Sequence, residues 1–230
     1  DLNGDGADEI VDMVGLGQPK IRTGDGEILF EPGTFVDAYG PGSNLNERSF
    51  VGLSGNPALG DMDGDGTPDL IIGGAGLNAL ASLVLTQSID SQFAVGGWSG
   101  ADGTSLNGWP RQLEDFQFLT AAAMADLSGD GKPEAVYGSA GYMAYAWDAE
   151  GAQPEGWPKF TGGWIMGSPA IGDIDGDGYL DVLVGTREGY LFAWSTQGPA
   201  DQPVQWQSLH HDAANTSNVA TEIPTQAGPE

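Results

Sequence analysis

The chain has 230 residues, enough for one large domain or two small ones, and its 33 acidic and 7 basic residues give a net charge of −26. Such a polyanion repels phosphate backbones and anionic lipids, which argues against nucleic-acid partners and direct membrane adhesion. The chain has no cysteine and no apolar run near the roughly 18 residues that span a bilayer, so we expect no disulfide, no thiolate metal site and no insertion into a membrane.

The rest of the composition favours an all-β fold. Hydrophobic residues, including seven tryptophans, make up 40% of the chain and are sufficient for a packed core. The 38 glycines and 14 prolines supply frequent turns. This combination is typical of many short strands rather than of helices.

An acidic loop at residues 1–9 is the first element in chain order. The same pattern recurs at residues 61–69, 126–134 and 173–181. Each copy carries side-chain oxygens at loop positions 1, 3, 5 and 9 and a glycine at position 6. Four copies in one register indicate an internally repeated fold.

Short apolar segments flank each later loop and are predicted to be strands. They precede the loops at residues 56–60, 121–125 and 168–172 and follow them at residues 70–73, 135–138 and 182–185. Further strands are predicted at residues 142–147 and 190–194, and Trp-Pro segments lie at residues 109–110 and 157–158. About four short strands in each roughly 45–65 residues are typical of a β-propeller blade.

The oxygen pattern of the loops predicts calcium sites. The four side chains and the backbone carbonyl at position 7 would supply the six or seven hard oxygens that Ca²⁺ prefers, whereas zinc and copper favour nitrogen or sulfur. The predicted carbonyl ligands belong to Ala7, Thr67, Lys132 and Tyr179. The predicted side-chain ligands are Asp1, Asn3, Asp5 and Glu9; Asp61, Asp63, Asp65 and Asp69; Asp126, Ser128, Asp130 and Glu134; and Asp173, Asp175, Asp177 and Asp181.

The third loop departs from this pattern, because Ser128 is a weaker ligand and Lys132 adds a positive charge beside it. We therefore expect three to four calcium ions per chain. The alternative is that the acids are only solvated turns, since Asp and Gly are common turn residues. Four copies in fixed register argue against that alternative.

The loops begin like an EF-hand. An EF-hand requires an acidic residue at loop position 12, within a following helix. Position 12 is Ile72, Tyr137 and Val184 in the last three copies, and only Asp12 in the first copy is acidic. The segments that follow are strand-like, so the EF-hand and a dockerin-type pair of such loops are both rejected.

The repeats resemble FG-GAP/VCBS repeats of the integrin-α-like β-propeller family. The resemblance rests on the Asp-x-Asp-x-Asp-Gly-x-x-Asp loop, the Pro-Ala-hydrophobic-Gly segment before it and the Asp-hydrophobic-hydrophobic-hydrophobic-Gly segment after it, and it covers residues 1–215. It implies an all-β propeller that binds calcium between the first two strands of each blade. About four blades are expected over residues 1–218, followed by a linker or tail at residues 219–230.

Propellers of this family usually close with about seven blades, so the resemblance implies that these blades are the C-terminal part of a larger propeller. A closed four-bladed ring is the alternative, with residues 204–209 supplying the missing first strand. The segment from Trp206 to Thr216 resembles one that closes many secreted bacterial proteins of this kind. It is interpreted as the outer strand and cap of the last blade. The competing interpretation makes His210, His211 and Asp212 a metal or catalytic cluster.

The sequence contains no recognisable catalytic constellation. Both histidines lie in the tail, and the acids outside the loops, such as Glu47, Glu114, Asp115 and Asp148, form no evident pair. Most tryptophans repeat with the blades and are expected to pack in the core. Trp98 and Trp164 break that register and are candidates to face a ligand, although the core is favoured for both.

We therefore expect a non-catalytic, calcium-binding extracellular propeller that recognises a protein or glycan at its loop-bearing face. Two alternatives stay open. One is the propeller part of a secreted polysaccharide lyase or hydrolase, against which the scattered basic residues argue. The other is a structural subunit of a surface assembly, in contact with other blades or chains.

Overall fold

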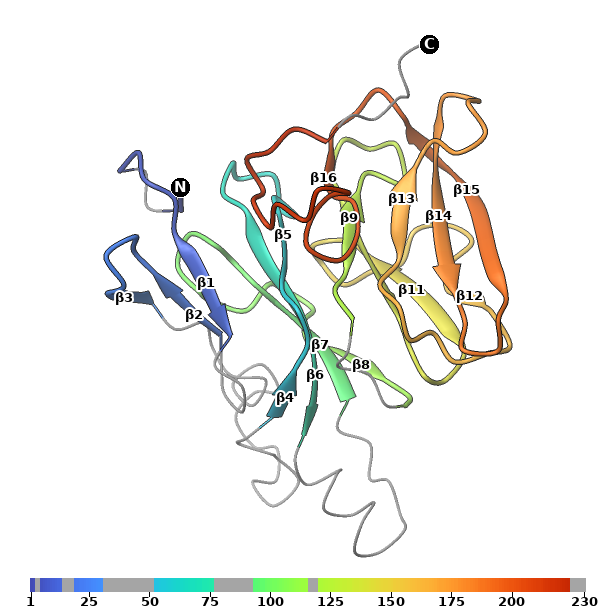
Figure 1. Cartoon of the computed structure of the whole chain (residues 1–230), viewed down its shortest axis with the longest axis horizontal. Coiled ribbons are helices and arrows are strands. Elements are labelled where there is room, and N and C mark those ends of the chain that lie inside the picture. Colours follow the sequence, from blue (N-terminus) through green and yellow to red (C-terminus); the bar gives the residue numbers. More distant parts are fainter. Residues whose placement is uncertain (3–4, 14–18, 31–51, 77–92, 116–119, 224–230) are drawn as a thin grey trace, which may run out of the picture.

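A computed structural model describes residues 1–2, 5–13, 19–30, 52–76, 93–115 and 120–223. These residues form four small antiparallel sheets, which confirms the all-β prediction. We number these sheets 1 to 4 in chain order. Figure 1 shows them side by side, from sheet 1 at the left to sheet 4 at the right. The described residues include no helix long and apolar enough to span a membrane.

Sheets 1 and 2 come from the first half of the chain. Sheet 1 contains β1 (Ile10–Met13), β2 (Pro19–Arg22) and β3 (Ile28–Phe30) in that order. Sheet 2 has β4 (Gly52–Ser54), β6 (Asp69–Gly76), β7 (Phe93–Trp98) and β8 (Arg111–Leu113) side by side, and β5 (Ala58–Gly60) also pairs with β6. The acidic loop at residues 61–69 joins β5 to β6, as predicted.

Sheets 3 and 4 repeat this arrangement. Sheet 3 contains β9 (Ala123–Ala125), β10 (Glu134–Gly138), β11 (Met143–Trp147) and β12 (Lys159–Phe160). Sheet 4 contains β13 (Ala170–Gly172), β14 (Tyr179–Gly185) and β15 (Leu191–Pro199). The acidic loops join β9 to β10 and β13 to β14, and they lie along the upper edge of the molecule in Figure 1.

Consecutive sheets pack face to face, because side chains alternate along each strand. In β6, Leu70 and Ile72 share a hydrophobic cluster with Ile21 of sheet 1. Ile71, which lies between them, belongs to the cluster that contains Tyr137 of sheet 3. One strand therefore contributes to the core on both of its faces.

The same alternation continues between sheets 3 and 4. Val136 of β10 shares a cluster with Val182 and Val184 of β14, all of them buried. Leu183, which is equivalent to Val136 in the repeat, lies on the other face of β14 and belongs to none of the clusters formed by the described residues. The outer face of sheet 4 therefore corresponds to the face of sheet 3 that sheet 4 covers.

The tail corrects two expectations. Its strand β16 (Val204–Trp206) pairs with β9, so the order in sheet 3 is β12-β11-β10-β9-β16. The tail is therefore not the outer strand of the last sheet, and it does not supply a first strand to sheet 1. The backbone of Gln207 instead accepts a hydrogen bond from the Ile171 N–H of sheet 4 at 3.0 Å. The tail is fixed between sheets by pairing partners that are distant in sequence.

Candidate metal centres

The four acidic loops adopt one hydrogen-bonded shape, which is organised by the first aspartate. In the second loop, the Asp61 carboxylate accepts hydrogen bonds from the N–H groups of Gly64 at 2.8 Å and Gly66 at 3.0 Å. In the fourth loop, Asp173 accepts from Gly176 at 2.7 Å and Gly178 at 3.1 Å. In the third loop, Asp126 accepts from Gly129 and Gly131 in the same way. In the described part of the first loop, Asp1 accepts from the N–H groups of Asp5 and Gly6. The chain therefore curls around the carboxylate at position 1.

The acid at position 9 closes each loop by reaching back to its start. Asp69 accepts a hydrogen bond from the Met62 N–H at 2.8 Å, and Asp181 accepts one from Ile174 at 3.0 Å. Glu134 and Glu9 make the equivalent bonds in the third and first loops. Since position 9 lies at or near the start of the following strand, this contact ties the loop to the sheet.

The glycine at position 6 is required by the backbone conformation. Its φ angle is +89° in Gly6, +92° in Gly66, +90° in Gly131 and +89° in Gly178. Residues with a Cβ atom rarely adopt this left-handed region. The glycine therefore permits the turn that brings the acidic side chains together.

Three of the loops bring carboxylates close enough to share one cation. Within each group, one oxygen of every residue lies within 4.8 Å of the others. All of these donors are hard oxygens, which suit calcium. Asn3 lies outside the described residues, and the carbonyl ligands at position 7 stay predictions. The groups are Asp1, Asp5 and Glu9; Asp61, Asp63 and Asp69; and Asp173, Asp175 and Asp181.

The position-5 acids of the second and fourth loops lie outside these groups. A carboxylate oxygen of Asp65 accepts a hydrogen bond from the Thr67 N–H at 2.7 Å, and Asp177 accepts one from Tyr179 at 2.9 Å. Asp65 and Asp177 therefore hold the second half of their loops, and their role as metal ligands stays a prediction.

The third loop has the same backbone but no such group. It contains Asp126, Asp130 and Glu134, yet these three are absent from the carboxylate groups that the described residues form. Position 3, which is Asp63 or Asp175 in the second and fourth loops, is Ser128 here. The Lys132 side chain points away from its own loop, and its Nζ donates to the Asp63 carbonyl at 2.9 Å. The third loop therefore differs from the second and fourth at position 3, and its predicted ligands stay predictions.

Burial and repulsion between carboxylates raise the pKa of two of the position-9 acids. Burial, together with the nearby Asp63 carboxylate, raises the pKa of Asp69 to about 7. Burial also raises the pKa of Glu134, with further contributions from Asp126 and Asp130. Without a cation, these loops hold negative charge in places where it is unfavourable. A bound divalent cation would remove this penalty.

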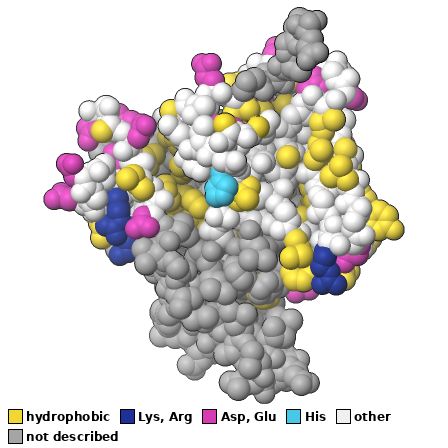
Figure 2. Space-filling view, in the orientation of Figure 1, with side chains coloured by type: hydrophobic (Ala, Val, Ile, Leu, Met, Phe, Trp, Pro, Cys, Tyr) yellow, Lys and Arg dark blue, Asp and Glu magenta, His cyan; other side chains and the backbone are white. Residues whose placement is uncertain are grey.

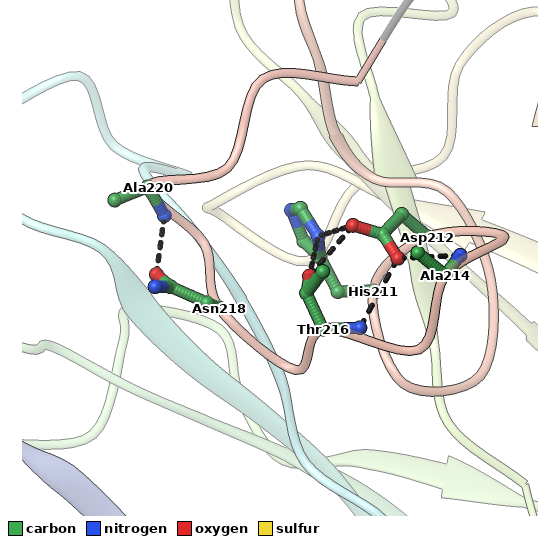
Figure 3. Close-up of polar contacts among 6 residues, drawn as sticks. All are labelled: His211, Asp212, Ala214, Thr216, Asn218 and Ala220. Atoms are coloured by element: carbon green, nitrogen blue, oxygen red, sulfur yellow. Dashed lines mark hydrogen bonds and ion pairs between the residues drawn. The ribbon is translucent and has the colours of Figure 1, made fainter.

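The tail cluster is compact and self-contained, as Figure 3 shows. Asp212 accepts hydrogen bonds from the Ala214 N–H at 2.9 Å, the Thr216 N–H at 3.1 Å and the Thr216 hydroxyl at 2.6 Å. Nδ1 of the buried His211 lies 3.1 Å from Asp212, and its ring packs against Trp206 with centroids 5.0 Å apart. Hydrogen bonding, chiefly from Thr216, lowers the pKa of Asp212 to about 2. These contacts fold the tail back onto itself.

The structure also shows contacts that sequence reasoning missed. Glu114 accepts hydrogen bonds from the Ser139 hydroxyl at 2.6 Å and the Tyr145 hydroxyl at 2.5 Å, so it joins sheet 2 to sheet 3.

Trp98 is 1% exposed and lies in the core, as favoured, whereas Trp164 is partly exposed and lies outside the three hydrophobic clusters. Its break from the tryptophan repeat was the available signal.

Comparison with known families agrees with the repeat. Residues 126–184, which run from the start of the third loop into β14, match the family described as FG-GAP-like repeat. No curated protein matches the chain significantly. The matched segment contains the third and fourth acidic loops and the strands from β10 to β13.

Proposed function

Because residues 126–184 form an FG-GAP-like repeat, we propose that the chain is a calcium-stabilised, non-catalytic part of an extracellular β-propeller that recognises a protein or a glycan. The observation that carries this proposal is the recurrence of three carboxylate groups in one loop register. Millimolar calcium outside cells suits weak modular sites of this type. Calcium would stabilise loops whose carboxylates repel one another, and the sheets would present the recognition surface.

The exposed outer face of sheet 4 supports the proposal of a larger propeller. Leu191 on this face is 71% exposed, whereas Ala144, its equivalent in sheet 3, is 0% exposed because sheet 4 covers it. Gly138 of sheet 3 has Ile165 so close that an added Cβ would lie 2.2 Å from the Ile165 Cγ2, whereas the equivalent Gly185 has nothing within 4 Å. A further sheet of the same repeat type is the occupant that would bury this face as sheet 4 buries sheet 3.

Thermal unfolding with calcium, with magnesium and with a chelator, alongside metal counting, tests the calcium proposal. We expect a calcium-specific rise in Tm and about three bound ions per chain. Asp61→Asn and Asp173→Asn should each remove one ion, while Asp148→Asn, outside the loops, should remove none. Unchanged unfolding with no bound metal would reduce the loops to acidic turns.

A further inference from the structure

A partly exposed tryptophan, Trp164, lies where sheets 3 and 4 meet, outside the three hydrophobic clusters of the described residues. Trp164 lies in the connection between β12 and β13, and the other six tryptophans belong to or pack against the hydrophobic clusters. Figure 2 shows hydrophobic, basic and acidic side chains together at the lower right edge, where Figure 1 places the turn between β14 and β15. This edge is opposite the acidic loops.

The turn between β14 and β15 holds Trp164 by its backbone on both sides. The Trp164 N–H donates to the Glu188 carboxylate at 2.9 Å, and its carbonyl accepts from the Arg187 N–H at 2.8 Å. Ile165 forms a β-bridge with Thr186, which continues the pairing. The indole is therefore presented by a fixed backbone, so little ordering entropy is lost when a ligand binds.

The charged side chains of Arg187 and Glu188 lie beside Trp164. The Arg187 guanidinium lies over the Trp164 ring, 5.4 Å from its centroid, and its Nε is 3.9 Å from the Glu188 carboxylate. Gly163 permits this arrangement, because a Cβ there would lie 2.3 Å from Glu188 Oε2. The Arg187 side chain is 61% exposed and that of Glu188 37% exposed, so both can still reach a ligand.

We propose that Trp164, Arg187 and Glu188 form a contact site for a neutral saccharide unit of a glycan. A sugar ring offers C–H groups that can contact the exposed part of the indole, and its hydroxyls can accept from the guanidinium and donate to the carboxylate. The opposite charges of Arg187 and Glu188 cancel, and the chain as a whole carries −26, which disfavours acidic ligands. The assignment rests on the proposed recognition function and narrows its ligand.

The test uses the intact chain with calcium on an array of neutral oligosaccharides, with alginate and hyaluronate as acidic comparators. We expect retention by at least one neutral saccharide. Trp164→Ala should weaken that binding at least tenfold, and Glu188→Gln severalfold, with the calcium-dependent Tm unchanged. Trp164→Phe should recover part of the binding, and Phe160→Ala, which removes an aromatic of β12 that is 68% exposed, should leave it intact.

Three results would overturn the assignment: no neutral saccharide retained, retention of acidic glycans alone, or Trp164→Ala binding as tightly as the parent chain. Metal counting on the same samples separates the two proposals. Bound calcium without saccharide binding defeats only the saccharide site. Absence of bound calcium defeats the proposed calcium function, whatever the array shows.

Discussion

The side chain of Gln205 accepts a hydrogen bond from the backbone N–H of Asp61 at 2.5 Å, which links the C-terminal tail to the start of the second acidic loop. The two residues are 144 positions apart. Gly60 makes room for the contact, since a Cβ there would lie 2.7 Å from Gln205 Oε1. The tail thus braces a candidate metal loop that belongs to another sheet.

Replacing Gln205 tests this brace. Gln205→Ala leaves the partly buried Asp61 N–H without its acceptor, so we expect a loss of about 1 kcal/mol in the free energy of unfolding, or roughly 2–4 °C in Tm. Gln202→Ala, at an exposed turn, is the matched control and should unfold like the parent chain. Equal Tm values for both variants would show that the tail does not stabilise the loop.

Substitutions at the equivalent glycines Gly138 and Gly185 test whether the outer face of sheet 4 is covered. Gly138→Ala places a methyl group against Ile165 and should cost about 1–3 kcal/mol, measured by chemical denaturation. Gly185→Ala meets open space, so its effect should stay within about 0.5 kcal/mol. If a further sheet is added to the protein and packs on sheet 4, Gly185→Ala should become as costly as Gly138→Ala. If the two substitutions destabilised the present chain equally, the outer face of sheet 4 would not be exposed.

The third loop can be converted into a stronger site. Ser128→Asp restores the carboxylate that the second and fourth loops carry at position 3, so we expect one additional calcium ion per chain and a higher Tm in calcium. Calorimetric titration measures the stoichiometry. Ser128→Asn adds an uncharged oxygen at the same place and should have a smaller effect. An unchanged ion count in Ser128→Asp would mean that Lys132, and not Ser128, limits this loop.

The raised pKa of Asp69 predicts a pH dependence whose sign differs with and without calcium. The pKa of Asp69 is about 7 in the folded, metal-free protein and 3.8 in the reference state. The folded state therefore binds the extra proton between these values, and metal-free stability should fall by roughly 2–4 kcal/mol from this group as pH rises from about 4 to 7. Calcium requires the ionised carboxylate, so its affinity should weaken as pH falls through 7.

The control for this dependence is Asp69→Asn, which removes the titrating group. The difference between parent and variant, followed by thermal unfolding in chelator at several pH values, isolates Asp69 from the other acids. Parallel stability curves for the two proteins would show that Asp69 titrates normally.

The loops and their flanking strands could be predicted from the sequence, because local interactions determine them. Position 6 must be glycine for the backbone to turn, and the aspartate at position 1 then bonds to N–H groups within five residues of it. The apolar runs after each loop were identified as strands for a similar reason, since their burial depends on a short sequence pattern.

Long-range contacts determine which strands pair and which side chains from different sheets meet. The sequence pattern of residues 204–206 is that of a short strand, but only tertiary packing selects β9 as its partner instead of the last strand of sheet 4. The same holds for Trp164, whose neighbours Arg187 and Glu188 arrive from the next sheet. Short apolar strands pair with many partners at similar energies, so the competition among whole sheets for buried area determines which pairing forms.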